Sequence, residues 1–376
     1  MEVTGVRQQR AWRQGVTPPV EQVRPGLWSI PVPIPRNPLR YVLVYAFGLD
    51  DGVAIVDAGW ECDEAWDALV SGLATAGYQV ADVRMVLVTH FHPDHFGLVG
   101  RVRAHSGAQV AMHPADACLL RHHGQDEVER FAHTSRRQMR RAGGPARLYE
   151  EQHALPLVRF DECDGADLAV GDGDLIDLPG WNLRAVWTPG HSPGHLCFVE
   201  RDLGLLLSGD HLLPRISPNI SLLPGQLPDP LGTYIASLRK IADLDVDEVL
   251  PAHEYRFRGL GERVRAMLHH HDERLAEIEQ VVTASSGVTA WQVTERLSWS
   301  RPFHLMPAAL MRLALRETLA HLHVLAAQRR LRETDGPAAR WYSCSVSDAP
   351  VLVPETGRHV TVSGPAPTAT SKEYPT

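Results

Sequence analysis

Short apolar runs separated by turn residues recur along most of the chain and predict a protein rich in β-strands. The early runs follow one another across turns that contain Pro, Asn or Gly, which indicates a strand meander over 27–34, 41–47 and 53–59. Further strand-length runs cover 85–88, 108–113, 183–189, 196–200, 204–210 and 247–254. Apolar residues at helical intervals predict helices within 61–77, 233–244 and 261–283.

Residues 114–152 interrupt this rhythm with a long stretch of helical composition. It carries seven arginines between Arg121 and Arg147. Two interpretations stay open: a solvent-exposed helical insertion, or a lid whose arginines face an anionic substrate.

The C-terminal region 285–346 has the pattern helix, helix, hairpin, which resembles a winged helix. Thr289 is a candidate N-cap for the first of these helices. Asp335 and Gly336 form a turn signal between two short strands. Residues 1–24 are polar and contain Pro, so we expect a flexible N-terminus. Residues 347–376 are dominated by Pro, Ser, Thr and Ala, so we expect a disordered tail.

Composition narrows the class of protein. The 376 residues are 44% hydrophobic and 22% charged, as in ordinary globular proteins. No apolar run approaches the roughly 20 residues that span a bilayer, and no signal peptide is visible. Five scattered cysteines without a CxxC pair favour reduced thiols and a cytoplasmic location. The net charge of −8 gives no overall attraction to nucleic acid or to an acidic membrane.

Histidine is the unusual component, and its most concentrated stretch is THFHPDHFG from Thr89 to Gly97. In an extended segment residues i and i+2 point the same way, so His90 and His92 can reach one cation. Asp94 and His95 follow the turn at Pro93 and point toward a second position. This spacing favours two metal ions over one.

Three later strands also end in residues that bind metals. His191 follows the strand 183–187, Asp210 ends the strand 204–210, and His253 ends the strand 247–254. Polar donors at four separate strand ends can meet at one edge of a sheet.

With these residues the chain, over about residues 24–260, resembles the metallo-β-lactamase-fold superfamily. The motif HxHxDH is present as His90, His92, Asp94 and His95. The resemblance implies an α/β fold, an αββα sandwich with its site at one edge of the sheets. It implies that Asp210 bridges two metals, whose other ligands form the groups His90, His92 and His191, and Asp94, His95 and His253. It further implies a catalytic domain over 25–284, followed by a small winged-helix-like domain.

Imidazole and carboxylate ligands without thiolate suit two divalent ions, most simply zinc, with iron or manganese also possible. Two such ions lower the pKa of a bridging water toward about 7 and so supply hydroxide at neutral pH. By the resemblance Asp94 also orients this water and passes its proton on. Asp57 and His195 are expected to support the ligands from behind rather than to bind metal.

Differences between this sequence and related enzymes reduce the number of candidate reactions. Position 210 is Asp, where β-lactamases with a zinc-binding cysteine have Cys, and His92 stands where diiron oxygen reductases have Glu. No large insertion follows Asp210, unlike the β-CASP nucleases. The glutathione-binding basic residues of glyoxalase II do not map onto the C-terminal region, which instead resembles that of β-lactamase-like endoribonucleases.

These comparisons predict a hydrolase for a thioester or another activated ester such as a lactone. Three alternatives stay open: a metal-dependent endoribonuclease, an iron-dependent sulfur dioxygenase, and a metal-sensing DNA-binding regulator. A small-molecule substrate is expected, with nucleic acid possible but not favoured, and homodimerisation is possible. Candidate substrate contacts near the expected site are Asn219, Tyr234 and Tyr255, for which plain packing is the competing interpretation.

Overall fold

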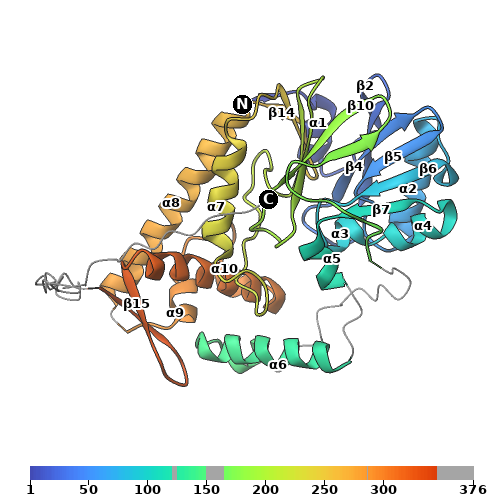
Figure 1. Cartoon of the computed structure of the whole chain (residues 1–376). Helices are drawn as coiled ribbons and strands as arrows, with labels where there is room; N and C mark the ends of the chain where they lie inside the picture. Colours follow the sequence, from blue (N-terminus) through green and yellow to red (C-terminus); the bar gives the residue numbers. More distant parts are fainter. Residues whose placement is uncertain (121–124, 150–164, 286, 345–376) are drawn as a thin grey trace, which may run out of the picture. The chain divides into compact units, whose positions relative to one another are not determined.

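Two mixed β-sheets, each with seven strands in the described residues, form the centre of the fold (Figure 1). The computed structural model describes residues 1–120, 125–149, 165–285 and 287–344. The strand order of one sheet is β1 (Glu2–Val3), β14 (Phe257–Arg258), β13 (Glu248–Pro251), β12 (Leu205–Gly209), β11 (Leu196–Glu200), β10 (Trp181–Trp187) and β9 (Leu175–Leu178). The order of the other is β2 (Glu21–Arg24), β3 (Leu27–Pro33), β4 (Tyr41–Leu49), β5 (Gly52–Val56), β6 (Val83–Leu87), β7 (Gln109–Met112) and β8 (Leu168–Ala169).

Period-two alternation in β4 shows how the layers form. Tyr41, Leu43, Tyr45 and Phe47 join the core between the two sheets, where they meet residues of β9 to β13. The intervening residues 42, 44 and 46 point to the opposite face. Successive side chains of a strand point to opposite faces, so one strand serves two cores.

Helices cover both outer faces, as expected for an αββα sandwich. On the β2–β8 sheet, α2 (Asp63–Thr75) and α4 (Val99–Ser106) pack over residues of β3 to β7. On the other sheet, α7 (Pro230–Ile241) and α8 (Leu260–Ala284) pack over β10 to β14. Short helical turns complete this part of the chain: η1 (Val80–Asp82) and α3 (Pro93–Phe96). The predicted fold class is therefore confirmed.

The N-terminal segment 1–24, expected to be flexible, is instead built into the fold. It contains β1, α1 (Val6–Gln14) and β2. β1 pairs with β14, and Trp12 is buried in the core between the sheets. The buried Gln8 side chain donates to Ser29 Oγ and accepts from the backbone N–H of Arg256. The polar composition of this segment gave no sign of these contacts. They join the segment to residues that are far away in the sequence.

The insertion at 114–152 is helical where the structure describes it. It contains α5 (Pro114–Leu120), α6 (Gln125–Arg141) and η2 (Ala146–Leu148). Met139 and Leu148 belong to the same core as the C-terminal helices. Backbone hydrogen bonds from Trp291 to Ala142 and from Ala339 to Arg141 add to this packing. The insertion thus packs against the C-terminal region.

After α8 the chain follows the predicted order helix, helix, hairpin. The elements are α9 (Ala290–Thr294), η3 (Phe303–Leu305), α10 (Ala308–Ala327), β15 (Leu331–Thr334) and β16 (Arg340–Ser343). Thr289 is the N-cap of α9, and its side chain and that of Gln292 form a reciprocal capping box. The winged-helix resemblance stays a prediction, and the predicted tail 347–376 lies outside the described residues. None of the helices in the described ranges is long and apolar enough to cross a membrane.

Candidate metal centre

Loops that follow four strands bring the predicted ligands together at one edge of the two sheets. His90 and His92 follow β6, and Asp94 and His95 lie in α3 directly after them. The remaining three side chains follow β10, β12 and β13: His191, Asp210 and His253. The ends of four strands thus bring these seven side chains close together.

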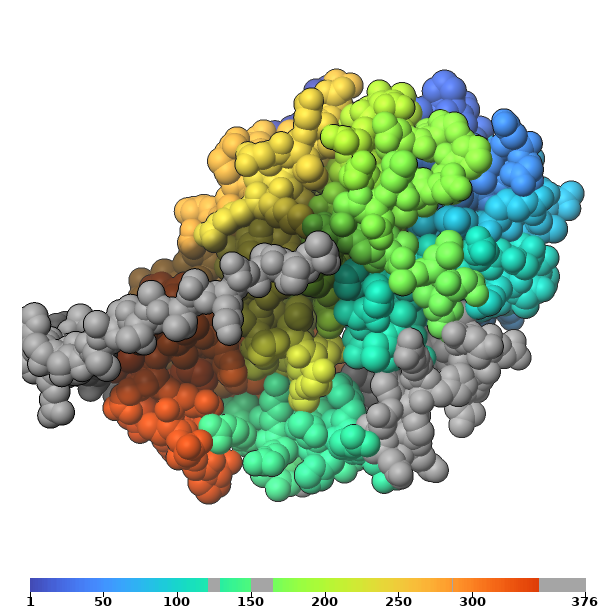
Figure 2. Space-filling model, in the orientation of Figure 1, coloured from blue at the N-terminus to red at the C-terminus, as the bar shows by residue number. Residues whose placement is uncertain are grey.

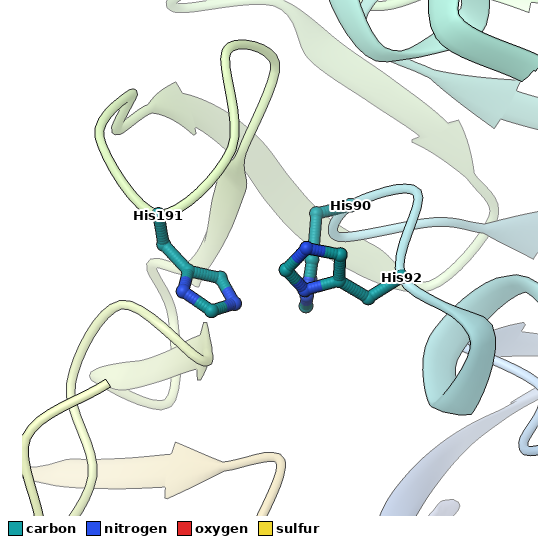
Figure 3. A group of neighbouring side chains, drawn as sticks. All are labelled: His90, His92 and His191. Atoms are coloured by element: carbon teal, nitrogen blue, oxygen red, sulfur yellow. The ribbon is translucent and has the colours of Figure 1, made fainter. Parts of the chain in front are cut away.

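Three histidines form the first group. The ligand atoms of His90, His92 and His191 lie within 4.8 Å of one another. Nε2 of His90 is 2.9 Å from Nδ1 of His92. Figure 3 shows the three imidazoles pointing toward a common space, with His191 reaching it from a different loop. Such an arrangement can hold one divalent ion through three nitrogens.

Asp94, His95 and His253 form a second group that meets the same distance limit. Nε2 of His253 lies 3.5 Å from Oδ2 of Asp94. Asp210 stands between the two groups, because its Oδ2 is 3.5 Å from His191 Nε2 while its Oδ1 is 3.1 Å from His253 Nε2. One carboxylate therefore faces both groups.

Several of these polar atoms are buried without a hydrogen-bond partner among the described residues. They are Nε2 of His95, His191 and His253, and Oδ1 of Asp210. Leaving a buried donor or acceptor unsatisfied costs about 1–3 kcal/mol. Divalent cations at this point would satisfy these atoms at once. The residues present therefore fit two metal ions.

Electrostatics divide the histidines into two sets. Burial, reinforced by the neighbouring histidines, holds the pKa of His90 and His92 well below the ordinary value. Burial also lowers the pKa of His191, against the opposing effect of Asp210. These three imidazoles are therefore neutral at pH 7, which is the form that binds metals.

His95 and His253 behave differently, since carboxylates surround them. Burial lowers the pKa of His95, but Asp57, Asp94 and Asp210 together raise it well above the ordinary value. The pKa of His253 is also raised, because Asp210 outweighs burial. In turn, these two histidines outweigh burial and hold the pKa of Asp210 well below its usual range. The carboxylates of this half thus favour a positive charge, which a bound cation would supply.

Hydrogen bonds behind the ligands orient their rings. Nδ1 of His191 donates to the carbonyl of Asn219 (3.0 Å), and Nδ1 of His253 donates to that of Tyr41 (2.8 Å). Nδ1 of His95 donates to Oδ2 of Asp57 at 2.7 Å. Each of these bonds occupies Nδ1, so Nε2 is the nitrogen that faces the centre. Asp57 thus lies directly behind His95.

His195 also lies behind the ligands. Its Nδ1 is 2.9 Å from Thr188 Oγ1, and its Nε2 accepts the backbone N–H of Asp210. Gly209 has φ +50°, and a Cβ there would stand 2.8 Å from His195 Nε2. Glycine is thus required for the backbone to approach this ring and present Asp210.

Asp116 is a residue of the centre that the sequence reasoning missed. Its buried carboxylate accepts hydrogen bonds from the backbone N–H of Phe91 (3.0 Å), Ser192 Oγ (2.7 Å) and the backbone N–H of Gly194 (2.5 Å). It therefore ties the loop of His90 and His92 to the loop of His191. Burial raises the pKa of Asp116 to about 6, while the three donors act in the opposite direction. The available signal was its place just after β7, which runs parallel to β6 and ends at the same sheet edge.

The three residues predicted as substrate contacts are buried or hydrogen-bonded within the protein. Tyr234 is fully buried, and its hydroxyl donates to the carbonyl of His211, so the structure gives this side chain a packing role. Tyr255 is also buried, with 5% of its surface exposed. Asn219 is partly exposed, but its amide donates to Glu317 and its carbonyl accepts from His191.

Known proteins are similar to this chain in sequence and in fold. The family model of the metallo-beta-lactamase superfamily matches residues 37–253. The chain is 26% identical over 296 residues to a probable metallo-hydrolase of Bacillus subtilis, and the alignment covers 75% of this chain and 86% of that protein. It is 25% identical over 266 residues to the lactamase-like protein adaB of Aspergillus niger, and the alignment covers 69% of this chain and 65% of that protein.

Two solved structures are similar over most of their length. A metallo-beta-lactamase family protein of Thermus thermophilus is 31% identical with a TM-score of 0.73, covering 86% of this chain and 100% of that one. A beta-lactamase domain protein of Burkholderia ambifaria is 26% identical with a TM-score of 0.68, covering 86% of this chain and 94% of that one. These similarities support a metallo-hydrolase in which the His and Asp groups are candidate ligands for divalent metal ions. The chain belongs to the metallo-beta-lactamase superfamily.

Proposed function

We propose that the protein is a dinuclear metal-dependent hydrolase that acts on a small-molecule thioester or another activated ester, including lactones. The observation that carries the proposal is the position of Asp210: its Oδ2 lies 3.5 Å from Nε2 of His191 in the first ligand group, and its Oδ1 lies 3.1 Å from Nε2 of His253 in the second. A single ion would leave one of these groups without a function.

When bound, the ions supply a water of lowered pKa and polarise the bond to be broken. The side chains of this chain then have distinct tasks. Asp94 is buried beside His253, and its carboxylate orients the attacking water and takes up its proton. Asp57 and His195 hold His95 and Asp210 in place.

The preference for an ester follows from the ligand set. Asp at position 210 is a harder ligand than the cysteine of zinc β-lactamases, which disfavours lactams. No nuclease-type insertion separates Asp210 from α7, since only residues 211–229 lie between them.

Metal analysis of the purified protein, followed by a hydrolysis screen, tests the proposal. We expect two equivalents of divalent metal and turnover of thioesters or lactones that is lost in His92→Ala and Asp210→Ala. One tightly held iron with oxygen uptake would instead indicate the sulfur dioxygenase. Ester turnover that survives both substitutions would rule out the proposed mechanism.

An endoribonuclease is the second candidate, and the surface of α6 favours it. Arg130, Arg136, Arg137 and Arg140 are exposed on this helix, which lies at the surface (Figure 2). Arginines on one helix can contact a phosphate backbone, and such binding weakens steeply with salt. Cleavage of single-stranded RNA at low salt that is lost in Arg130→Glu/Arg137→Glu would favour this candidate.

The DNA-binding regulator receives less support. It needs a basic recognition helix, and the arginines of α10 point into their own chain. Arg316 is buried and donates to Ser135 Oγ, while Arg312 donates to the carbonyl of Leu148. They are therefore engaged in packing α10 against the insertion.

A further inference from the structure

The loop 211–229, between β12 and α7, is held by three helices that lie outside the two sheets. Arg263 of α8 donates to the carbonyls of Leu213 and Ile216, at 2.6 and 2.7 Å. Gln138 of α6 donates to the carbonyl of Leu222 at 2.8 Å, and the N–H of Leu222 donates to the carbonyl of Arg316 in α10. The path of this loop is therefore determined by α6, α8 and α10.

Asn219, in the middle of this loop, contacts both the metal centre and α10. Its backbone carbonyl accepts the Nδ1 proton of His191 at 3.0 Å. Its side-chain amide donates to Oε2 of Glu317 at 3.0 Å, and its Oδ1 accepts Ser221 Oγ. The next residue, Ile220, is fully buried in the core that α7, α8 and α10 share. The backbone of Asn219 thus contacts the metal centre, while its side chain contacts α10.

We propose that Glu317 is a positioning residue for the metal centre, which acts through Asn219 to orient His191. The proposal rests on the metal site assigned above. By holding the amide of Asn219, Glu317 keeps the carbonyl of this residue beside Nδ1 of His191. That bond fixes the tautomer in which Nε2 carries the lone pair and faces Asp210. The C-terminal helix α10 is then a part of the metal centre rather than a separate module.

Metal affinity of the full-length protein, measured by competition with a chromophoric chelator, tests the proposal without any substrate. We expect Glu317→Ala and Asn219→Ala each to weaken the binding of one of the two ions about ten- to a hundredfold, as for other residues behind metal ligands. The double variant should bind no more weakly than Glu317→Ala, because both substitutions break one connection. Glu317→Gln should retain most of the affinity, since its amide oxygen still accepts from Asn219.

Glu279→Ala is the matched control. Glu279 also joins two elements outside the sheets, since it lies on α8 and accepts hydrogen bonds from Arg330, which follows α10 and lies outside the loop 211–229. The variant should bind both ions as the wild type does. Equal weakening in this control, wild-type affinity in Glu317→Ala, or additive losses in the double variant would each overturn the proposal. If Glu317→Ala does not fold, Asn219→Ala and Glu317→Gln decide it by the same criteria.

The experiments distinguish the role of Glu317 from the proposed ester hydrolase activity. A protein that binds two ions and shows the expected losses, but hydrolyses no ester, would refute the ester hydrolase and leave the role of Glu317 standing. Ester hydrolysis with unchanged metal affinity in Glu317→Ala would do the reverse.

Discussion

Nδ1 of His95 lies 2.7 Å from Oδ2 of Asp57, and both side chains are buried. The same carboxylate accepts the backbone N–H and the hydroxyl of Thr89, so it joins the end of β5 to the end of β6 and to α3. Asp57 has φ +62°, a left-handed conformation that few residues other than glycine adopt. Strain of this kind persists only where surrounding contacts over-determine it, as these do.

We therefore expect Asp57→Asn to weaken metal binding about ten- to a hundredfold, because the amide cannot accept from all the donors around it. Chelator competition on the purified variant measures the change. Asp82→Asn is the control, since Asp82 also accepts a backbone N–H, from Gln79, but at the exposed turn before β6. Unchanged affinity in Asp57→Asn would show that this pair does not support the centre.

Asp116 provides a second prediction. Asp116→Asn keeps the side-chain volume but leaves at least one of the donors from Phe91, Ser192 and Gly194 without an acceptor. We expect the free energy of unfolding to fall by about 1–3 kcal/mol, with weaker binding of the metal at His90, His92 and His191. Urea unfolding and metal titration measure both effects.

The control for Asp116 is Asp167→Asn. Asp167 also accepts a backbone N–H, from Val110, and pairs with Arg103, but its side chain is 29% exposed. Its replacement should change stability less and leave metal affinity intact. Loss of metal affinity in this variant alone would contradict the assignment of Asp116.

Gly190 allows a test of how tightly the loop of His191 packs against α7. Its φ is +141°, and a Cβ there would meet the backbone Cα of Tyr234 at 2.6 Å. Gly190→Ala should therefore lower the unfolding free energy by about 1–3 kcal/mol, the usual cost of overpacking, and should weaken metal binding. Gly100→Ala is the control: it lies in α4 with open space around the added methyl, and alanine there should stabilise by roughly 0.5–1 kcal/mol.

Removal of metal should lower the melting temperature of the protein. Ions that bind only the folded state stabilise it, by about 4 kcal/mol at a free concentration a thousand times the Kd. We expect a chelator to lower the melting temperature and added zinc to restore it. In Asp210→Ala this change in melting temperature should be smaller, because the variant lacks the carboxylate that faces both ligand groups. A melting temperature indifferent to chelator would contradict the metal site.

His271 gives the expected pH dependence of stability. It is buried between α8 and α10 with Nδ1 3.2 Å from Nε2 of His321. Burial and His321 lower its pKa to about 2, whereas the unfolded value is about 6.5. Below pH 6.5 this histidine binds a proton in the unfolded state but not in the folded state. The free energy of unfolding therefore decreases as the pH is lowered, by on the order of 2 kcal/mol at pH 5. The pKa of His321, lowered to about 4, acts in the same direction.

The comparison that isolates this effect is His271→Gln, whose amide does not titrate. In the presence of chelator, the wild type should lose more unfolding free energy between pH 7 and pH 5 than the variant does. Urea unfolding at the two pH values measures the difference. Parallel losses in both proteins would show that His271 is not responsible.

The sequence by itself determined the features that depend on near neighbours. The i, i+2 spacing of His90 and His92 and the turn at Pro93 predicted two ligand groups, which the structure brings together at one sheet edge. Thr289 was predicted as an N-cap because the capping bond spans only three residues. The alternation in β4 likewise follows from strand geometry alone.

Only the tertiary structure decided which distant residues support the site. Asp116 bonds to Ser192 76 positions away, and Asn219 bonds to Glu317 98 positions away. The burial of Trp12, in a segment expected to be flexible, also depends on distant contacts. Periodicity and motif spacing report on residues a few positions apart. Partners separated by dozens of residues become neighbours only when the sheets and helices pack, so no local pattern could have indicated them.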